Sequence, residues 1–129
     1  EVSSIAGLQL EVSPALAVNG QALRTQPIVR VLSLSSNTLL ASRHVVTARL
    51  ISSSSCKGIG SASNLEMSVT AQQGRAVFSD ISIFAEAGFC SLQFLISLGD
   101  NGSAPFVSVD SQPIYVMQNS PSLTLQTHL

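Results

Sequence analysis

The sequence predicts an all-β domain, a sandwich of two packed antiparallel sheets with seven to nine short strands and Greek-key connections. Three observations lead to this prediction. Apolar residues alternate with polar ones in many short segments, which is the period of a strand with one buried face. Turn residues separate these segments at intervals of about 8–12 residues. The sequence shows no apolar stripe at helical spacing.

The alternation is clearest between Gln73 and Phe94. Gly74 lies where a tight hairpin turn is expected, and Ala87-Gly88 marks a break between two strands. The residues expected to face the core are Ala76, Phe78, Ile81, Ile83, Cys90, Leu92, Phe94 and Ile96. We expect the rest of the chain to be organised around this stretch.

The segments on either side follow the same rule. Strands are expected at residues 8–12, 28–32, 44–51, 65–69, 88–98, 106–109 and 113–117, with turns at 19–20, 35–37 and 99–102. We expect the strand at 65–69 to pair with residues 76–78 through the turn at Gly74. Residues 52–64, rich in serine and glycine, are expected to form a flexible loop.

Composition narrows the class of function. The 129 residues suit one domain with its own core. Only 10% are charged and the net charge is −1, where about 25% charged is usual. Such a chain does not attract nucleic acid or anionic membranes over a distance. A surface of serine, threonine and amides is typical of secreted or cell-surface β-proteins, and low net charge favours contact with other chains or domains.

Two cysteines, Cys56 and Cys90, allow one disulfide or two buried free thiols. Their spacing fits neither a zinc site nor a CxxC redox motif. No apolar run approaches the ~20 residues of a membrane-spanning helix, so we expect no direct membrane insertion. No basic and apolar leader precedes Glu1, so any signal peptide is expected to lie outside this sequence.

The polar residues predict no catalytic or metal site. His44 and His128 have no second ligand at metal spacing, and no Gly-x-Ser-x-Gly motif occurs. Glu66 and Glu86 flank strands and could approach each other, but acid–base chemistry would also need a pocket. Asp100-Asn101-Gly102 lacks the further ligands of a calcium loop and is expected to be a turn. We therefore expect no enzyme activity and no cofactor.

Asn101-Gly102-Ser103 is an N-glycosylation sequon in a predicted exposed turn. A glycan at Asn101 is expected if the protein is secreted by a eukaryotic route. Otherwise the sequon has arisen by chance.

The end of the sequence repeats the form of its beginning. Ser122–Gln126 (SLTLQ) has the pattern of Gly7–Glu11 (GLQLE), and residues 118–121 have linker composition. We expect residues 1–6 to be a leading linker and 7–117 to be one repeat. Residues 118–129 are then a linker and the first strand of a following repeat, or a last strand added to the same domain.

Most of residues 7–117 resembles the bacterial-type immunoglobulin-like repeats of invasin-like adhesins, surface stalks and appendages. The most specific part is Gly74-x-Ala76-x-Phe78-x-Asp80-x-x-Ile83, followed by Ala87-Gly88. The resemblance implies an immunoglobulin-like sandwich. Gly74 would serve the hairpin, Ala76 and Phe78 would enter the core, Asp80 would cap a turn and Gly88 would open the penultimate strand. None of these positions is catalytic.

The chain departs from the family at three places. Cys90 stands where the family has an inward tyrosine, and Cys56 lies in an unusually long loop. Together these departures imply a disulfide that holds the loop to the core. Ser35-Ser36-Asn37 replaces an acidic turn, which puts a calcium site at that end in doubt.

These points predict a non-catalytic structural module of an extracellular, multi-repeat protein. It would act as a spacer or as a building block of a stalk, filament or appendage. Its partners would be neighbouring repeats or copies of itself. The alternative is an adhesion module whose end loops recognise a cell-surface protein or glycan. Tyr115 and Phe106 are the candidate contact residues, because binding surfaces favour exposed aromatics.

Overall fold

The computed structural model of the chain describes residues 5–33, 35, 37–38, 40, 43–51, 56–60, 64–86, 88–97 and 106–118. Every regular element in these ranges is a strand, which confirms the predicted all-β class. The strands are β1 (Ile5–Val12), β2 (Ala17–Val18), β3 (Ile28–Ser33), β4 (Val45–Leu50), β5 (Cys56–Ile59), β6 (Glu66–Thr70), β7 (Arg75–Val77), β8 (Ile83–Ala85), β9 (Gly88–Cys90), β10 (Leu92–Ser97), β11 (Phe106–Asp110) and β12 (Ile114–Met117).

The described residues thus form twelve strand segments, where the sequence predicted seven to nine. One reason is that the strand expected at 88–98 divides at Ser91 into β9 and β10. Another is that residues 56–59, expected within a flexible loop, form β5 and pair with β8. Burial explains this difference, because Cys56, Gly58 and Ile59 all face away from solvent.

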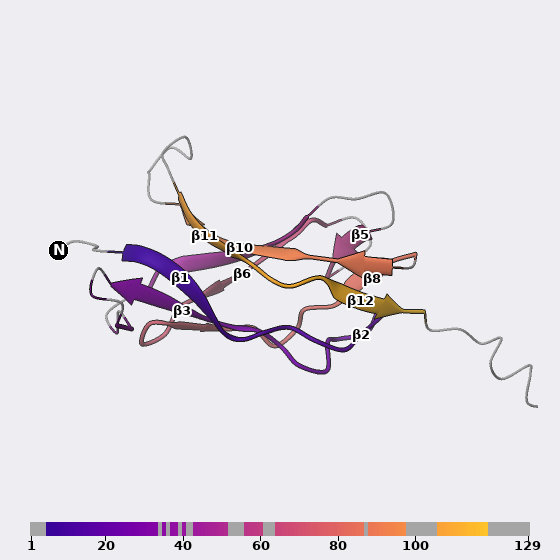
Figure 1. Ribbon diagram of the computed structural model, residues 1–129, viewed down its shortest axis with the longest axis horizontal. Helices are drawn as coiled ribbons and strands as arrows, with labels where there is room; N and C mark the ends of the chain where they lie inside the picture. The colour runs from indigo at the N-terminus through magenta and orange to yellow at the C-terminus, as the bar shows by residue number, and fades with distance from the viewer. Residues whose placement is uncertain are drawn as a thin grey trace, which may run out of the picture.

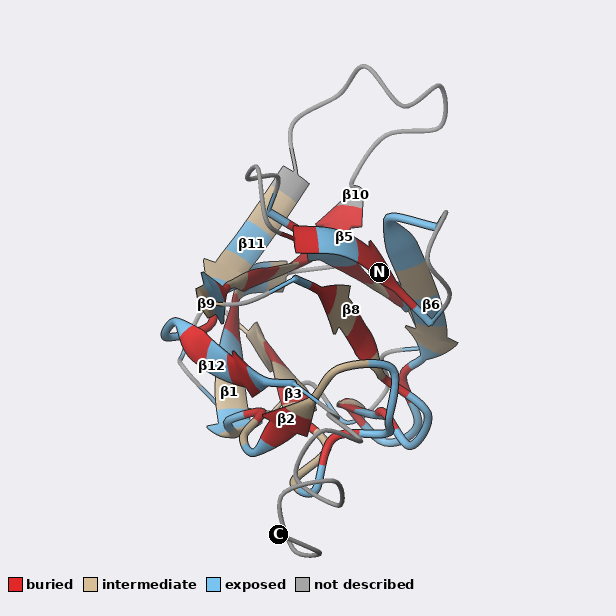
Figure 2. Ribbon diagram, turned by 90° about the vertical axis from the view of Figure 1, so that its right-hand side faces the viewer, coloured by how far each residue is buried: buried red, intermediate tan, exposed pale blue. Residues whose placement is uncertain are grey.

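Hydrogen bonds join the strands into four sheets. One has four strands in the order β11-β10-β4-β6, two have three strands in the orders β1-β3-β7 and β2-β12-β9, and the last is the pair β5-β8. All pairs are antiparallel except β12 with β2. Figure 2 shows β10, β11 and β6 on one side of the interior and β1 and β3 on the other. This arrangement of antiparallel sheets is consistent with the predicted sandwich.

The strands run along the long axis of the molecule (Figure 1). β1 begins at one end of this axis and β12 finishes at the opposite end. β1 starts at Ile5, so the strand includes two residues that the sequence assigned to the leading linker. The described chain therefore enters and leaves the domain at opposite ends.

The core follows the predicted alternation. All eight residues expected to face inward between positions 76 and 96 are buried, each with at most 2% of its surface exposed. Val29 and Val31 of β3 and Val46 and Ala48 of β4 complete the interior. The rings of Phe78 and Phe94 meet across the core with centroids 5.6 Å apart.

The predicted turn at Gly74 is present, but the strands on either side of it separate. Gln73 and Gly74 both have positive φ (53° and 80°), as a two-residue type I′ turn requires. Beyond the Gln72–Arg75 bridge, however, β6 pairs with β4 and β7 pairs with β3. The expected pairing of 65–69 with 76–78 is therefore wrong. The turn carries the chain from one sheet to the other, so that both strands can face the same core.

A long pair of antiparallel segments is interrupted half-way along. β10 pairs with β11, where Phe94 lies opposite Val109, and β9 pairs with β12, where Cys90 lies opposite Ile114. Between the two halves, the Leu92 amide donates to Ser111 Oγ (2.9 Å) and the Ser111 amide donates to the Leu92 carbonyl (2.7 Å). The serine side chain thus takes the place of a backbone acceptor where the ladder is interrupted.

Candidate functional site

The acidic residues singled out in the sequence do not form a pair. Glu66 Oε2 lies 3.0 Å from Arg49 Nε, whereas Glu86 Oε2 lies 3.4 Å from Lys57 Nζ. Each carboxylate is exposed and has its own cation. His44 precedes β4, and its backbone carbonyl accepts a hydrogen bond from the Ala71 amide. In the ranges that the structure describes, no three His, Cys, Asp or Glu residues are grouped as a metal site would need.

Cys56 and Cys90 form a disulfide, with an S–S distance of 2.01 Å and Cα atoms 6.0 Å apart. The bond joins β5 to β9, and both half-cystines are buried. The alternative of two free thiols is therefore excluded. The bridge holds the start of β5 next to the strand pair β9–β12, as the resemblance implied for the loop that contains Cys56.

The motif residues follow the length of the core, from the Gly74 turn beside β3 to Ile83 in β8 and Gly88 in β9. Ala76, Phe78 and Ile83 are buried, Gly74 occupies the hairpin turn and Gly88 begins β9 with a φ of 99°. Asp80 is exposed. The backbone amide of the next residue donates to another side chain.

That side chain is Gln26, which the sequence analysis did not single out. Its Oε1 accepts a hydrogen bond from the Ile81 amide (3.0 Å). Its Nε2 donates to the carbonyls of Ile81 (3.0 Å) and Leu23 (3.1 Å). One amide group therefore holds the segment after β7 against the segment before β3. A glutamine before Pro27 gives no sequence signal for this role, because the partner lies 55 residues away.

Four apolar side chains lie exposed around β9 and β12, and we name them the aromatic patch: Leu16, Phe89, Tyr115 and Met117. Phe89 and Tyr115 face each other across the two strands, with ring centroids 5.2 Å apart in an edge-to-face arrangement. They are 61% and 54% exposed. Large exposed apolar groups that cluster in this way mark interaction surfaces more often than isolated ones do.

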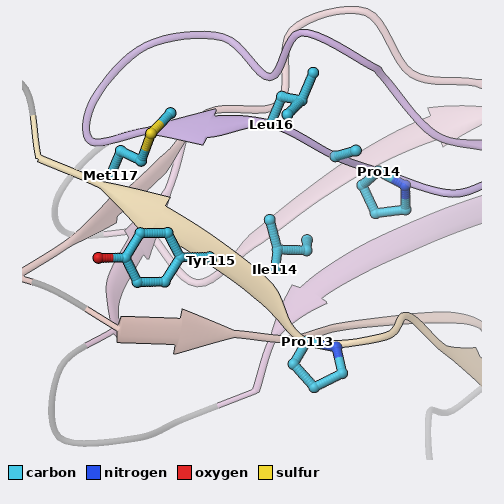
Figure 3. A pocket seen from close by; sticks show the side chains of 7 residues that line it. Pro14, Leu16, Pro113, Ile114, Tyr115 and Met117 are labelled. Carbon is cyan, nitrogen blue, oxygen red and sulfur yellow. The ribbon is translucent and has the colours of Figure 1, made fainter.

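A groove runs along one side of the aromatic patch. β2 and β12 pair from Ala17 and Val116 onward. Ahead of this point the two segments leave a space of about 260 Å³ between them. Figure 3 shows Tyr115 and Met117 on the β12 side of this groove and Pro14 and Leu16 on the other. The lining is mostly apolar and includes no charged residue.

The sequence analysis found only part of this surface. It named Tyr115, and it named Phe106, whose side chain lies outside the described part of the structure. It missed Phe89, although the alternation that buries Cys90 must turn residue 89 outward. The sequon at Asn101, the turn at 99–102 and His128 also lie outside the described residues.

A small hydrogen-bond network holds the end of β12. The backbone amide of Asn19 donates to the Met117 carbonyl (2.8 Å), and the side-chain oxygen Oδ1 of Asn19 accepts from the backbone amide of Ala85 (3.0 Å). Gln118 Nε2 donates to the Ala85 carbonyl (3.2 Å). The last described residues are therefore fixed both to Asn19, which follows β2, and to β8.

A scan against protein-family models finds no model that matches this chain, and a search of curated proteins finds no match. Within the described residues, no helix is long and apolar enough to cross a membrane.

Proposed function

We propose that the chain is a non-catalytic, immunoglobulin-like module of an extracellular multi-repeat protein, and that it serves as a spacer or building block of a stalk or filament. One observation carries this proposal: the described chain enters at one end of an elongated domain and leaves at the other (Figure 1). Domains of this geometry extend an array by their full length when they are joined in series.

The strand order supports the immunoglobulin-like part of the proposal. In immunoglobulin sandwiches the first, second and fifth strands share one sheet, and the third, sixth and seventh share the other. β1, β3 and β7 correspond to the first group, and β4, β10 and β11 to the second. The strand before the Gly74 turn differs from the constant-type order, in which the fourth strand shares a sheet with the fifth, because β6 pairs with β4 in the second group.

The pairing at the two ends suits a module under tension. β2 and β12 are parallel, with Ala17 opposite Val116 and Val18 opposite Met117. A force applied through β1 and through Gln118 pulls these two strands in opposite directions along their axes. Their hydrogen bonds are then loaded together in shear instead of opening one after another.

The disulfide and the composition support an extracellular location. Disulfides persist in oxidising compartments and are rare where glutathione keeps thiols reduced. Few charges must be stripped of water when such a surface meets a neighbouring module. Both features suit a chain that works outside the cell beside other domains.

Sequencing of the native protein that carries this chain tests the proposal. We expect further copies on either side with the spacing Gly-x-Ala-x-Phe-x-Asp-x-x-Ile followed by Ala-Gly. We also expect mass spectrometry of the intact protein to show alkylated cysteines only after the protein has been reduced. A flanking catalytic domain without any second copy, or two freely alkylated thiols in the native protein, would contradict it.

The aromatic patch favours one alternative, an adhesion module that binds a cell-surface protein or glycan. The exposed groups lie on strand faces beside a groove and not on end loops, which changes the expected binding site. Saturable quenching of tyrosine emission by a soluble glycan, lost in Phe89→Ala, would favour this function over the spacer. Because Tyr115 is the only tyrosine and the chain has no tryptophan, the signal reports this surface alone.

A further inference from the structure

We propose that the segment Ser122–Gln126 of the same chain occupies the groove between β12 and residues 14–16, as an added last strand whose leucines cover the aromatic patch. No described residue fills this groove, and the described chain finishes at Gln118, next to Met117 on its rim. The occupant is therefore attached at the edge of the surface that it would cover.

The sequence after Gln118 has the chemistry that this surface needs. Leu123 and Leu125 alternate with Ser122, Thr124 and Gln126, which gives a short strand with one apolar face. The segment contains no charge, so its burial against an uncharged groove strips no ion of water. The two leucines match the spacing of Leu8 and Leu10 in β1, which turn the same way toward the interior.

The length of chain is sufficient. Four residues lie between Gln118 and Leu123, and the five steps from one to the other can span at most about 17 Å. With a reversal within residues 119–121, Leu123 lies beside Met117 and Leu125 lies two residues farther toward the Pro113 end, within the roughly 13 Å that the four residues of β12 cover. Pro121 and the preceding Asn119-Ser120 provide the turn chemistry for the reversal.

The proposal can hold whether or not the chain serves as a spacer, but it changes the geometry of that role, because a strand that turns back along β12 moves the exit of the chain away from the Gln118 end. It decides between the two possibilities that the sequence left open for residues 118–129. If these residues begin a following repeat, they leave the groove uncovered in the isolated chain.

Tyr115 provides the test. Acrylamide quenching of tyrosine emission is measured for the full chain, for a chain ending at Gln118 and for L123S/L125S. We expect the quenching constant to rise about twofold in the truncated and leucine variants, since an aromatic ring that is about half exposed loses its cover. The matched control T124S/Q126N changes only the opposite face and should behave as the full chain does.

Two further measurements make the result decisive. Circular dichroism and the unfolding midpoint show that each variant is folded, and all core residues lie before Gln118. Nuclear Overhauser contacts between the Leu123 or Leu125 methyl groups and the Tyr115 ring would establish the contact directly. Equal quenching in the full and truncated chains would overturn the proposal. Protection that grows with protein concentration, with a dimer in sedimentation, would overturn it in favour of a second copy.

Discussion

The long antiparallel strand pair has two halves, β10 with β11 and β9 with β12. Their inner faces are alike, whereas their outer faces differ. Along the inside, both halves present apolar residues at every second position, and the buried ones are Leu92, Phe94 and Ile96 in β10, Cys90 in β9, and Ile114 and Val116 in β12. On the outside, β10 and β11 carry Gln93, Ser108 and Asp110 with one buried leucine, Leu95. The outer side of β9 and β12 carries Phe89, Tyr115 and Met117, all exposed.

This difference distinguishes residues that are apolar because they fill the core from residues that are apolar for another reason. The inner face must be apolar in both halves because it fills the core. The outer face is free to be polar, and in β10 and β11 it mostly is. The outer face of β9 and β12 is aromatic instead, and the core of the described domain does not require aromatic residues at these positions. The apolar side chains there are better explained by something that covers them, which is the basis of the inference above.

Replacement of an inner aromatic should have the largest effect on stability. Phe94 is fully buried and packs on Phe78. We expect Phe94→Ala to lower the free energy of unfolding by about 3–5 kcal/mol, because it removes buried area and leaves a cavity. Urea denaturation measures the change. Phe94→Leu, which keeps more of the volume, should lose clearly less, and an equal loss in both variants would argue against the cavity.

Removal of the disulfide should have the next largest effect. The bridge closes a separation of 34 residues, and the loop-entropy model assigns such a bond about 3–4 kcal/mol. We expect C56A/C90A to lose this amount in urea denaturation, and wild type in reductant to behave similarly. Because the bond ties β9 to β5, amide exchange in β9 should rise more than in β10. Uniform exchange in both strands would show that the bridge acts only on the unfolded chain.

Ser111 should contribute a smaller and more local amount at the junction between the halves. Ser111→Ala leaves the buried Leu92 amide without its side-chain acceptor, which costs about 1–3 kcal/mol. Urea denaturation gives the size, and faster exchange of the Leu92 amide gives the location. Ser108→Ala is the matched control, since Ser108 is exposed on the neighbouring strand. If the two variants lose the same stability, Ser111 does not replace a backbone acceptor.

The sequence predicted what depends on local alternation. The burial of Ala76, Phe78, Cys90 and Phe94 followed from a period of two, and the turn at Gly74 followed from turn chemistry. Both are properties of adjacent residues, which a single sequence contains. The orientation of Phe89 was available from the same pattern, since it must point away from the side that Cys90 faces.

Which strands pair with each other could not be predicted in the same way. Nothing near residues 65–78 indicates that β6 pairs with β4 while β7 pairs with β3, because the choice depends on which sheet has room for each strand. The roles of Gln26 and Ser111 depend on backbone groups 55 and 19 residues away. A serine or glutamine has the same chemistry in a solvated loop, so only the folded chain distinguishes these two from the many others.

The outer aromatic pair, Phe89 and Tyr115, should contribute least to the stability of the domain. Measuring this contribution tests most directly whether the inner and outer faces have different roles. Phe89 is exposed and meets Tyr115 edge to face, so Phe89→Ala should cost about 0.5–1.5 kcal/mol, the size of such a pair. A double-mutant cycle with Tyr115→Ala isolates the coupling of the two rings in urea denaturation. The same cycle in a chain ending at Gln118 removes any cover that residues 119–129 provide. If Phe89→Ala costs as much as Phe94→Ala in both chains, the outer face is a second core and the distinction between the two halves fails. If the cost is small and shrinks further in the shorter chain, the aromatic patch is maintained for a contact and not for the fold.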